Sequence, residues 1–158
     1  MKKEYLIIIG IVLVFLLIFM LTRKSDTTLI TKCSLVSDQS ANGYVDTTNY
    51  NIEYKDDLVV SIEQIETIDS KDKSILDFFK KQLVNQYKSY DKLYGGYSYS
   101  VKEEPDKVIV TINIDYNKLD MEKFIKDNPG MKQYVNEDNK LTYNGVISMY
   151  KNIGVVCE

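Results

Sequence analysis

The chain has 158 residues, a net charge of −3 and 44% hydrophobic residues, which suits one folded domain with a single core. Histidine is absent, which excludes histidine-activated nucleophiles and most catalytic zinc sites. Without the first 24 residues the net charge is about −6, which argues against nucleic acid as a partner. We therefore predict no catalytic residue, cofactor site or metal site, and a protein that is not an enzyme.

An apolar segment lies close to the N-terminus. Residues 6–21 are apolar apart from Gly10, and a helix with one further residue at each end spans about 27 Å, enough to cross a bilayer core. The sequence therefore predicts an N-terminal transmembrane helix, with a membrane anchor at 1–24, a linker at 25–28 and an extracytoplasmic α+β domain at 29–158. Basic residues flank the segment on both sides, and the free α-amine favours a cytoplasmic N-terminus.

Two other interpretations of this segment have less support from the sequence. A cleaved signal peptide requires a small-residue cleavage site, and residues 21–24 offer none. A lipoprotein would be acylated at Cys33, but Lys32 stands directly before this cysteine. We therefore expect a single-pass protein of the cell membrane whose C-terminal domain is extracytoplasmic.

Period-two alternation predicts three consecutive strands, at residues 29–37, 44–54 and 58–67. In the third run Leu58, Val60 and Ile62 share one face before the register shifts toward Ile65, which indicates a bulge. These strands are short and follow one another directly. We therefore expect an antiparallel meander.

A long amphipathic helix follows the meander. Ser70 is the predicted N-cap, residues 71–94 carry an apolar stripe at spacings of three and four, and Gly95 and Gly96 end the helix. Several tyrosines belong to this stripe. We interpret them as core-facing aromatics with hydrated hydroxyls rather than as a ligand platform.

The second half predicts a hairpin at 97–101 and 108–116, followed by two short helices. Asp120 and Thr142 are the expected N-caps, and Leu141 and Val146 form a hydrophobic staple around the second. The predicted fold class is α+β, with an N-terminal transmembrane helix and an antiparallel sheet of about five strands. The element order is βββ-α-ββ-α-α, and the helices pack on one face.

Cys33 and Cys157 are the only cysteines, near the two ends of the predicted domain. An even pair beside an export-type segment favours a disulfide over two buried thiols. A bridge would place the domain outside the cytoplasm.

Three acidic stretches invite a functional interpretation. Residues 56–57 and 103–104 supply adjacent carboxylates, but both are predicted hairpin turns rather than facing acids in a cleft. Residues 136–139 are rich in oxygen ligands but lack the spacing of a calcium loop. We interpret all three as solvated turns.

A family resemblance emerges from residues 111–123, with the sequence TINIDYNKLDMEK, and from the Asn-Pro-Gly sequence at 128–130. This pattern resembles the small YehR-like bacterial lipoproteins, and the likeness extends over most of residues 58–153. The chain departs from that family because it has no lipobox and carries an apolar anchor segment. The resemblance implies a surface-anchored α+β domain and transfers no catalytic residue.

These features together predict a membrane-anchored extracytoplasmic binding or accessory domain of the bacterial cell envelope, with an unknown ligand. The alternative is a cell-envelope hydrolase that uses carboxylates only. A third possibility is a structural partner recognised through the apolar helix, for which Gly10 is slight support. A binding module should cluster exposed tyrosines, whereas a hydrolase needs two facing carboxyls in a pocket, at least one with a raised pKa.

Overall fold

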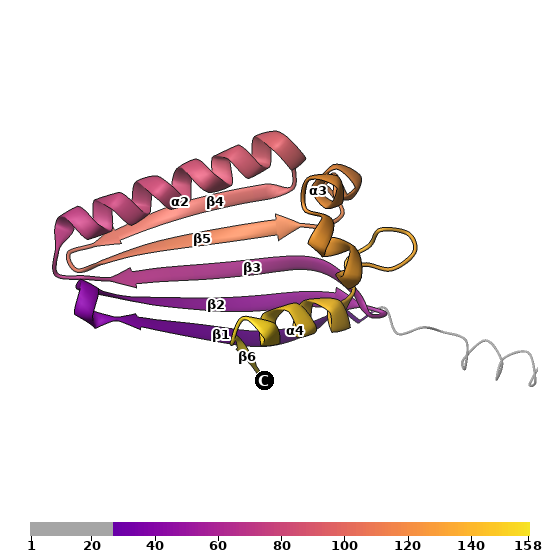
Figure 1. Cartoon of the computed structure of the whole chain (residues 1–158), viewed down its shortest axis with the longest axis horizontal. Coiled ribbons are helices and arrows are strands. Elements are labelled where there is room, and N and C mark those ends of the chain that lie inside the picture. Colours follow the sequence, from indigo (N-terminus) through magenta and orange to yellow (C-terminus); the bar gives the residue numbers. More distant parts are fainter. Residues whose placement is uncertain (1–26) are drawn as a thin grey trace, which may run out of the picture.

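The fold is described for residues 27–158, from a computed structural model. The strands are β1 (Leu29–Gln39), β2 (Tyr44–Lys55), β3 (Leu58–Asp69), β4 (Tyr97–Glu104), β5 (Lys107–Asp115) and β6 (Val156–Cys157). The helices are α2 (Lys73–Tyr94), α3 (Met121–Asp127) and α4 (Tyr143–Asn152), with 3-10 segments η1 (Ser40–Asn42) and η2 (Pro129–Tyr134). The six strands form one antiparallel sheet in the order β4-β5-β3-β2-β1-β6 (Figure 1).

The predicted fold class is wrong in its number of strands. The sheet has six strands rather than about five, because Val156 and Cys157 pair with Ser34 and Cys33 at the outer edge of β1. Two residues are too few to show an alternating pattern, so this strand had no sequence signal. The predicted anchor at 1–24 lies outside the described residues, and within residues 27–158 no helix is long and apolar enough to cross a membrane.

The helices pack on one face of the sheet because the strands carry their apolar side chains on that face. Residues paired across antiparallel strands point to the same side, so Ile52 and Ile62 form part of one row, and both are almost fully buried. Neighbouring positions such as Asn51 and Glu63 point to the opposite, open face. The covered face therefore holds the core.

The core has two parts. One lies under α4 and η2 and includes Val146, which is fully buried. The other lies under α2 and includes Leu83 and Ile112. Figure 1 shows α2 over the β4 side of the sheet and α4 over β1 and β2, so the two parts are side by side on the same face.

The third strand has a different register from the one predicted. The bulge falls where Glu53 and Tyr54 pair with the start of β3, and Val59, rather than Leu58 or Val60, joins the core. Because the pairing is regular after this point, Gln64, Glu66 and Ile68 follow Ile62 on the covered face. Ile65 lies on the open face.

The start of α2 also differs from the prediction. Asp72, not Ser70, is the N-cap, and its carboxylate accepts a hydrogen bond from Ser74 N. The Ser70 hydroxyl is already engaged because it donates to Gly43 O at 2.7 Å. The predicted end of the helix is confirmed, since Gly95 and Gly96 have φ of +68° and +75°.

The predicted caps of the two short helices are confirmed. Asp120 accepts from Lys123 N and Thr142 accepts from Gly145 N, each at 3.0 Å. Leu141, on the N-terminal side of the Thr142 cap, is buried in the core part under α4 together with the first turns of that helix.

Candidate functional site

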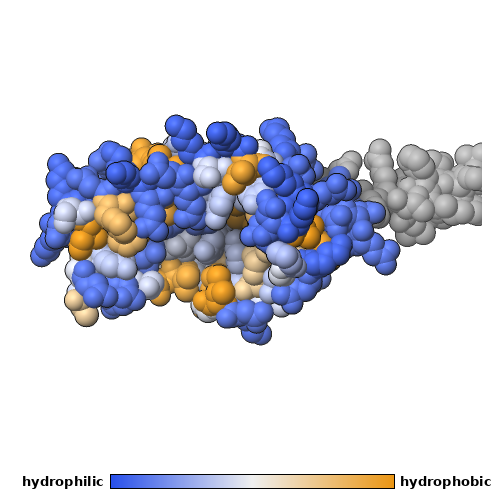
Figure 2. All heavy atoms as spheres, turned by 45° about the horizontal axis from the view of Figure 1, so that its top comes forward, coloured by the Kyte–Doolittle hydropathy of each residue, from blue (hydrophilic) through white to orange (hydrophobic). Residues whose placement is uncertain are grey.

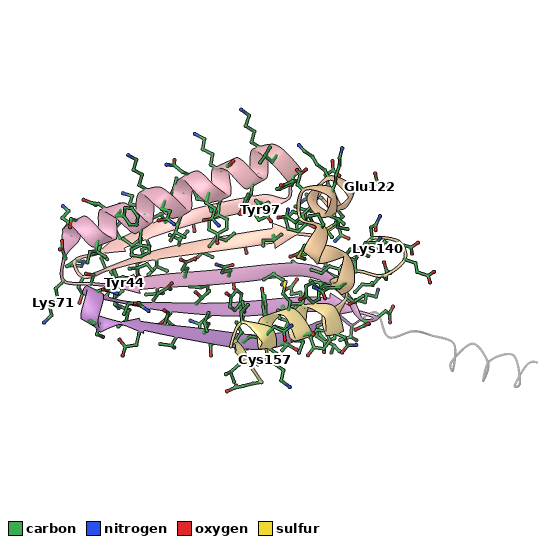
Figure 3. All side chains as sticks on the ribbon, in the orientation of Figure 1. Tyr44, Lys71, Tyr97, Glu122, Lys140 and Cys157 are labelled. Atoms are coloured by element: carbon green, nitrogen blue, oxygen red, sulfur yellow. A yellow bond between two sulfur atoms is a disulfide. The ribbon has the colours of Figure 1, made fainter. Side chains whose placement is uncertain are left out.

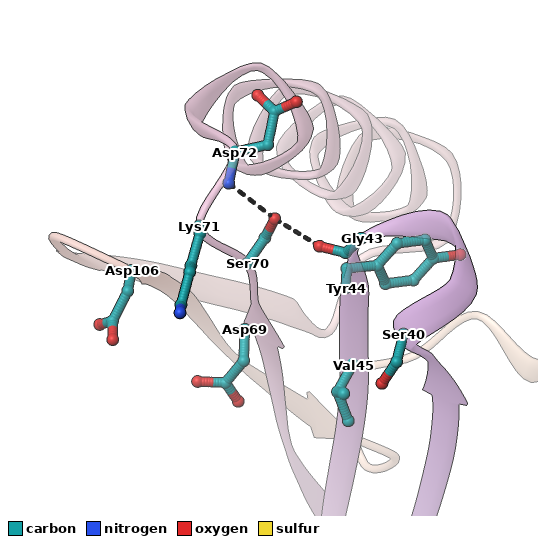
Figure 4. A pocket seen from close by; sticks show the side chains of 9 residues that line it. All are labelled: Ser40, Gly43, Tyr44, Val45, Asp69, Ser70, Lys71, Asp72 and Asp106. Carbon is teal, nitrogen blue, oxygen red and sulfur yellow. Dashed lines mark hydrogen bonds between the residues drawn. The ribbon is translucent and has the colours of Figure 1, made fainter.

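One cavity lies at the end of the sheet opposite to Thr27. It has a volume of about 490 Å³, and Figure 3 shows Tyr44 and Lys71 at this end and Lys140 at the other. We call it the distal pocket. It is lined by Ser40, Gly43, Tyr44, Val45, Asp69, Ser70, Lys71, Asp72 and Asp106 (Figure 4).

The Ser70 hydroxyl organises the wall of the distal pocket. It donates to Gly43 O at 2.7 Å and accepts from Asp72 N at 3.0 Å, which joins the start of β2 to the start of α2 (Figure 4). Ser70 is only 7% exposed, so both hydrogen bonds are shielded from water. This link fixes the backbone around the pocket.

The distal pocket combines an apolar wall with an acidic rim. The ring of Tyr44 packs against Phe79, with 4.8 Å between the ring centroids, and holds its side of the pocket rigid. Three aspartates but only one lysine line the cavity. Asp69 pairs with Lys107 at 3.4 Å, and hydrogen bonds from Ser74 lower the pKa of Asp72.

A second group of polar side chains lies on the covered face, where β2 and β3 run past α2. We call it the polar seam; its members are Asp46, Thr48, Tyr50, Gln64, Glu66 and Tyr87. In Figure 2 blue hydrophilic spheres cover much of the surface in view, with orange hydrophobic spheres and pale spheres of intermediate hydropathy between them. At the polar seam, polar and tyrosine side chains occupy positions on the covered face that are apolar elsewhere in the core.

Hydrogen bonds join the polar seam across elements. The Gln64 side-chain amide donates to Glu66 Oε2 at 3.1 Å and to Tyr87 Oη at 3.0 Å, so it links β3 to α2. Within the described residues, Oδ1 of Asp46 is buried without a hydrogen-bond partner. Such an atom carries a desolvation cost that protonation can relieve.

Burial raises the pKa of titratable groups in the polar seam. Desolvation, assisted by the charge of Asp46, raises the pKa of Glu66 to about 7, against an opposing hydrogen bond from Gln64. Desolvation also raises the pKa of Asp46, although a hydrogen bond from Thr48 acts in the other direction. Burial raises the pKa of Tyr87, and the charge of Glu66 adds to this shift. Glu66 is therefore a carboxyl that titrates near neutral pH.

The tyrosines form part of the core rather than an exposed platform. Every tyrosine of residues 27–158 is buried or half-buried. Tyr87, Tyr90, Tyr94 and Tyr97 form a series of ring contacts between α2 and β4, with centroids 5.6 to 6.2 Å apart. The exposed tyrosine cluster expected of a binding module is thus not found in this part of the chain.

The residues singled out in the sequence are dispersed. Cys33 and Cys157 form a disulfide, with an S–S distance of 2.09 Å and Cα atoms 3.9 Å apart. Asp56 and Asp57 lie in the β2–β3 turn, both with positive φ.

The other two acidic stretches also form contacts of their own. Glu103 and Glu104 lie at the end of β4, so the predicted turn at these residues is wrong. Glu103 forms an ion pair with Lys80, and Glu104 forms one with Lys102. In the 136–139 turn, the side chain of Asn136 accepts hydrogen bonds from the backbone nitrogens of Asp138 and Lys140. No group of three or more potential metal ligands occurs in the part of the chain that the structure describes.

The open face carries a shallow cavity of about 310 Å³ that is lined by Ile30 and by polar residues of β1, β2, β3 and β5. Its carboxylates are already satisfied, because Asn51 donates to Glu63 and Ser61 donates to Glu53, each at 2.7 Å. The strands hold these pairs directly opposite one another. The carboxylates of this cavity are therefore already paired within the sheet.

Two solved structures share this fold. The NMR structure of the E. coli YehR protein matches with a TM-score of 0.56 and 18% identity, over 84% of this chain and 92% of that chain. An NMR structure of a protein from Streptococcus pneumoniae TIGR4 matches with a TM-score of 0.50 and 16% identity, over 87% and 88%. No family model and no curated protein match the chain. The expected resemblance is confirmed for the fold of the domain, and at these identities it carries no activity to this chain.

Proposed function

We propose that this protein is a non-enzymatic binding domain of the bacterial cell envelope, tethered to the membrane by its apolar N-terminal segment and exposed outside the cytoplasm. The apolar composition of residues 6–21 and the lack of a cleavage site after them support the tether. The Cys33–Cys157 disulfide supports the location, because such bonds persist in oxidising compartments.

The observation that carries the binding role is the distal pocket. Strand β1 has 11 residues, so at about 3.3 Å per residue the pocket lies about 35 Å from the end of the sheet where the N-terminal segment joins. A domain tethered at Leu29 would hold this cavity away from the membrane. The cavity volume falls within the range of small-molecule sites.

The lining of the pocket selects the chemistry of its ligand. Tyr44 and Val45 offer an apolar surface. Asp69 is already paired with Lys107, and Asp72 already accepts hydrogen bonds from Ser74. The carboxylate that we assign to a ligand is therefore that of Asp106. A small group with a flat or aliphatic part and a positive charge meets both requirements. We therefore assign the pocket to a cationic, partly apolar ligand.

Benzamidine and benzoate test this assignment because they have the same shape and opposite charges. With the full-length chain in detergent micelles, we expect isothermal titration to detect weak binding of benzamidine and none of benzoate, and Asp106→Asn to weaken it several-fold. Asp138→Asn, in an exposed turn at the other end of the domain, is the matched control. Equal binding of both compounds, or of neither, would contradict the proposal.

The tether has its own test. Intact-mass analysis of membrane-extracted protein should show residues 6–21 retained, and a C-terminal alkaline phosphatase fusion should be active in intact cells. Loss of about the first 25 residues would overturn the tether, and an inactive fusion would overturn the orientation.

The alternative of a carboxylate-only hydrolase has one supporting observation, the raised pKa of Glu66 beside Asp46. Neither residue lines any of the four cavities described. A hydrolase requires substrate to reach both carboxyls, so the binding role is better supported. Turnover of envelope polysaccharide that disappears in Glu66→Gln would reverse this preference.

A further inference from the structure

The geometry of the polar seam brings two carboxyls of neighbouring strands together. Thr48 pairs with Glu66 and Asp46 pairs with Ile68, so Asp46 and Glu66 are diagonal neighbours on the covered face. Diagonal side chains across an antiparallel pair lie within about 7 to 8 Å. The two acids are therefore half-buried neighbours rather than separate, fully exposed side chains.

The groups around this pair add no compensating positive charge. Asp46 acts on Glu66 from β2, and the charge of Glu66 in turn raises the pKa of Tyr50 on β2 and of Tyr87 on α2. Each of these groups becomes more negative when it loses a proton. On the β5 side, Glu66 pairs with Val110, which is apolar and fully buried. Ionisation of both acids would thus place two like charges in an environment that solvates neither of them well.

We propose that Asp46 and Glu66 form a pH-sensitive latch, which holds α2 against β2 and β3 while the pair retains a proton and loosens this contact when both acids are ionised. Gln64 joins the pair to α2, because its amide donates to both Glu66 and the Tyr87 hydroxyl. The bond to Glu66 itself favours the ionised carboxylate, so the loosening comes from hydration of the second charge and not from loss of this bond. Water that enters to solvate the second charge must enter between the strands and the helix. The latch does not depend on a ligand in the distal pocket.

The direction of the effect follows from linkage. The pKa of Glu66 is about 7 in the folded protein and 4.5 in the unfolded chain, so the folded state holds the proton more tightly. Its stabilising contribution is complete below about pH 4.5, declines as the pH rises, and is lost above pH 7. Loosening of α2 is therefore expected as the pH passes through neutrality.

Hydrogen exchange on the full-length chain in micelles tests the latch. After correction for intrinsic exchange rates, we expect the protection of amides in the middle of α2 to fall about tenfold from pH 6 to pH 8. Glu66→Gln should abolish this fall, and Asp46→Asn should move it to lower pH. Glu63→Gln, on the open face of the same strand, should behave like the unsubstituted protein.

Constant protection of α2 between pH 6 and pH 8, or the same fall in Glu66→Gln, would overturn the latch. If Glu66→Gln does not fold, the ¹³C resonance of the Glu66 carboxyl in the unsubstituted protein decides the matter. Titration of this resonance near pH 7 together with the fall in protection supports the latch. Titration near pH 4.5 refutes it.

Discussion

Reduction of the Cys33–Cys157 disulfide should cost the domain a large part of its stability. The two cysteines are 124 positions apart, so the bond closes almost the whole domain into one loop. In the chain-entropy description, a loop of this length stabilises the folded state by about 5 kcal/mol at 25 °C, as an upper value. Typical domains are stable by about 5 to 15 kcal/mol, so the reduced protein should be marginal.

Urea unfolding of the oxidised and reduced full-length protein at one pH measures this difference without a change of sequence. We expect the reduced form to unfold at a much lower urea concentration, and a Cys33→Ser/Cys157→Ser variant to agree with it to within about 1 kcal/mol. The reasoning would be refuted if reduction changed the free energy of unfolding by less than about 1 kcal/mol.

Packing predictions come with matched controls. Gly145→Ala should destabilise the domain by more than about 2 kcal/mol, because the new Cβ would collide with the backbone oxygen of Tyr134, whereas Gly130→Ala, which meets no atom within 4 Å, should be neutral. Ile62→Ala should cost about 3 to 4 kcal/mol because the side chain is 2% exposed, and Ile30→Ala, at 59% exposure, should cost less than about 1 kcal/mol. Urea midpoints measure both pairs, and equal effects within a pair would contradict the packing described here.

Most strands and helices were predictable because their signals are local. The even spacing of Tyr44, Tyr50 and Ile52 predicts β2, and Asp120 and Thr142 cap helices through hydrogen bonds that span only three residues. The start of α2 was not predictable in this way. Ser70 and Asp72 are both good caps, and a contact with Gly43, distant in sequence, decides between them.

The Asp46–Glu66 pair could not be predicted because the predicted register of β3 was wrong. A shift of the core side to Ile65 places Glu66 on the solvent side, where a glutamate needs no explanation. With the bulge at its true position, Glu66 takes the same side as Ile62 and Ile68. Polar residues at core positions of a strand are the signal that would have found the pair, since Asp46 also alternates with core residues.

The distal pocket had no signal in the sequence. Its residues come from the β1–β2 connection, the β3–α2 connection and the β4–β5 turn, three segments that are ordinary turns when taken one at a time. Their proximity depends on the order of the strands in the sheet. That order is set by packing of the whole covered face rather than by local propensity.

The disulfide also determines how the domain would respond to a pulling force. Tension applied between Thr27 and Glu158 passes from Cys33 directly to Cys157, so the residues between the two cysteines, which are 124 positions apart, bear none of it. Only the few residues outside the loop can extend. Once the bond is reduced, the same pull can draw out about 400 Å of chain, at about 3.3 to 3.6 Å per residue. A domain crosslinked in this way acts as a short, nearly inextensible connector.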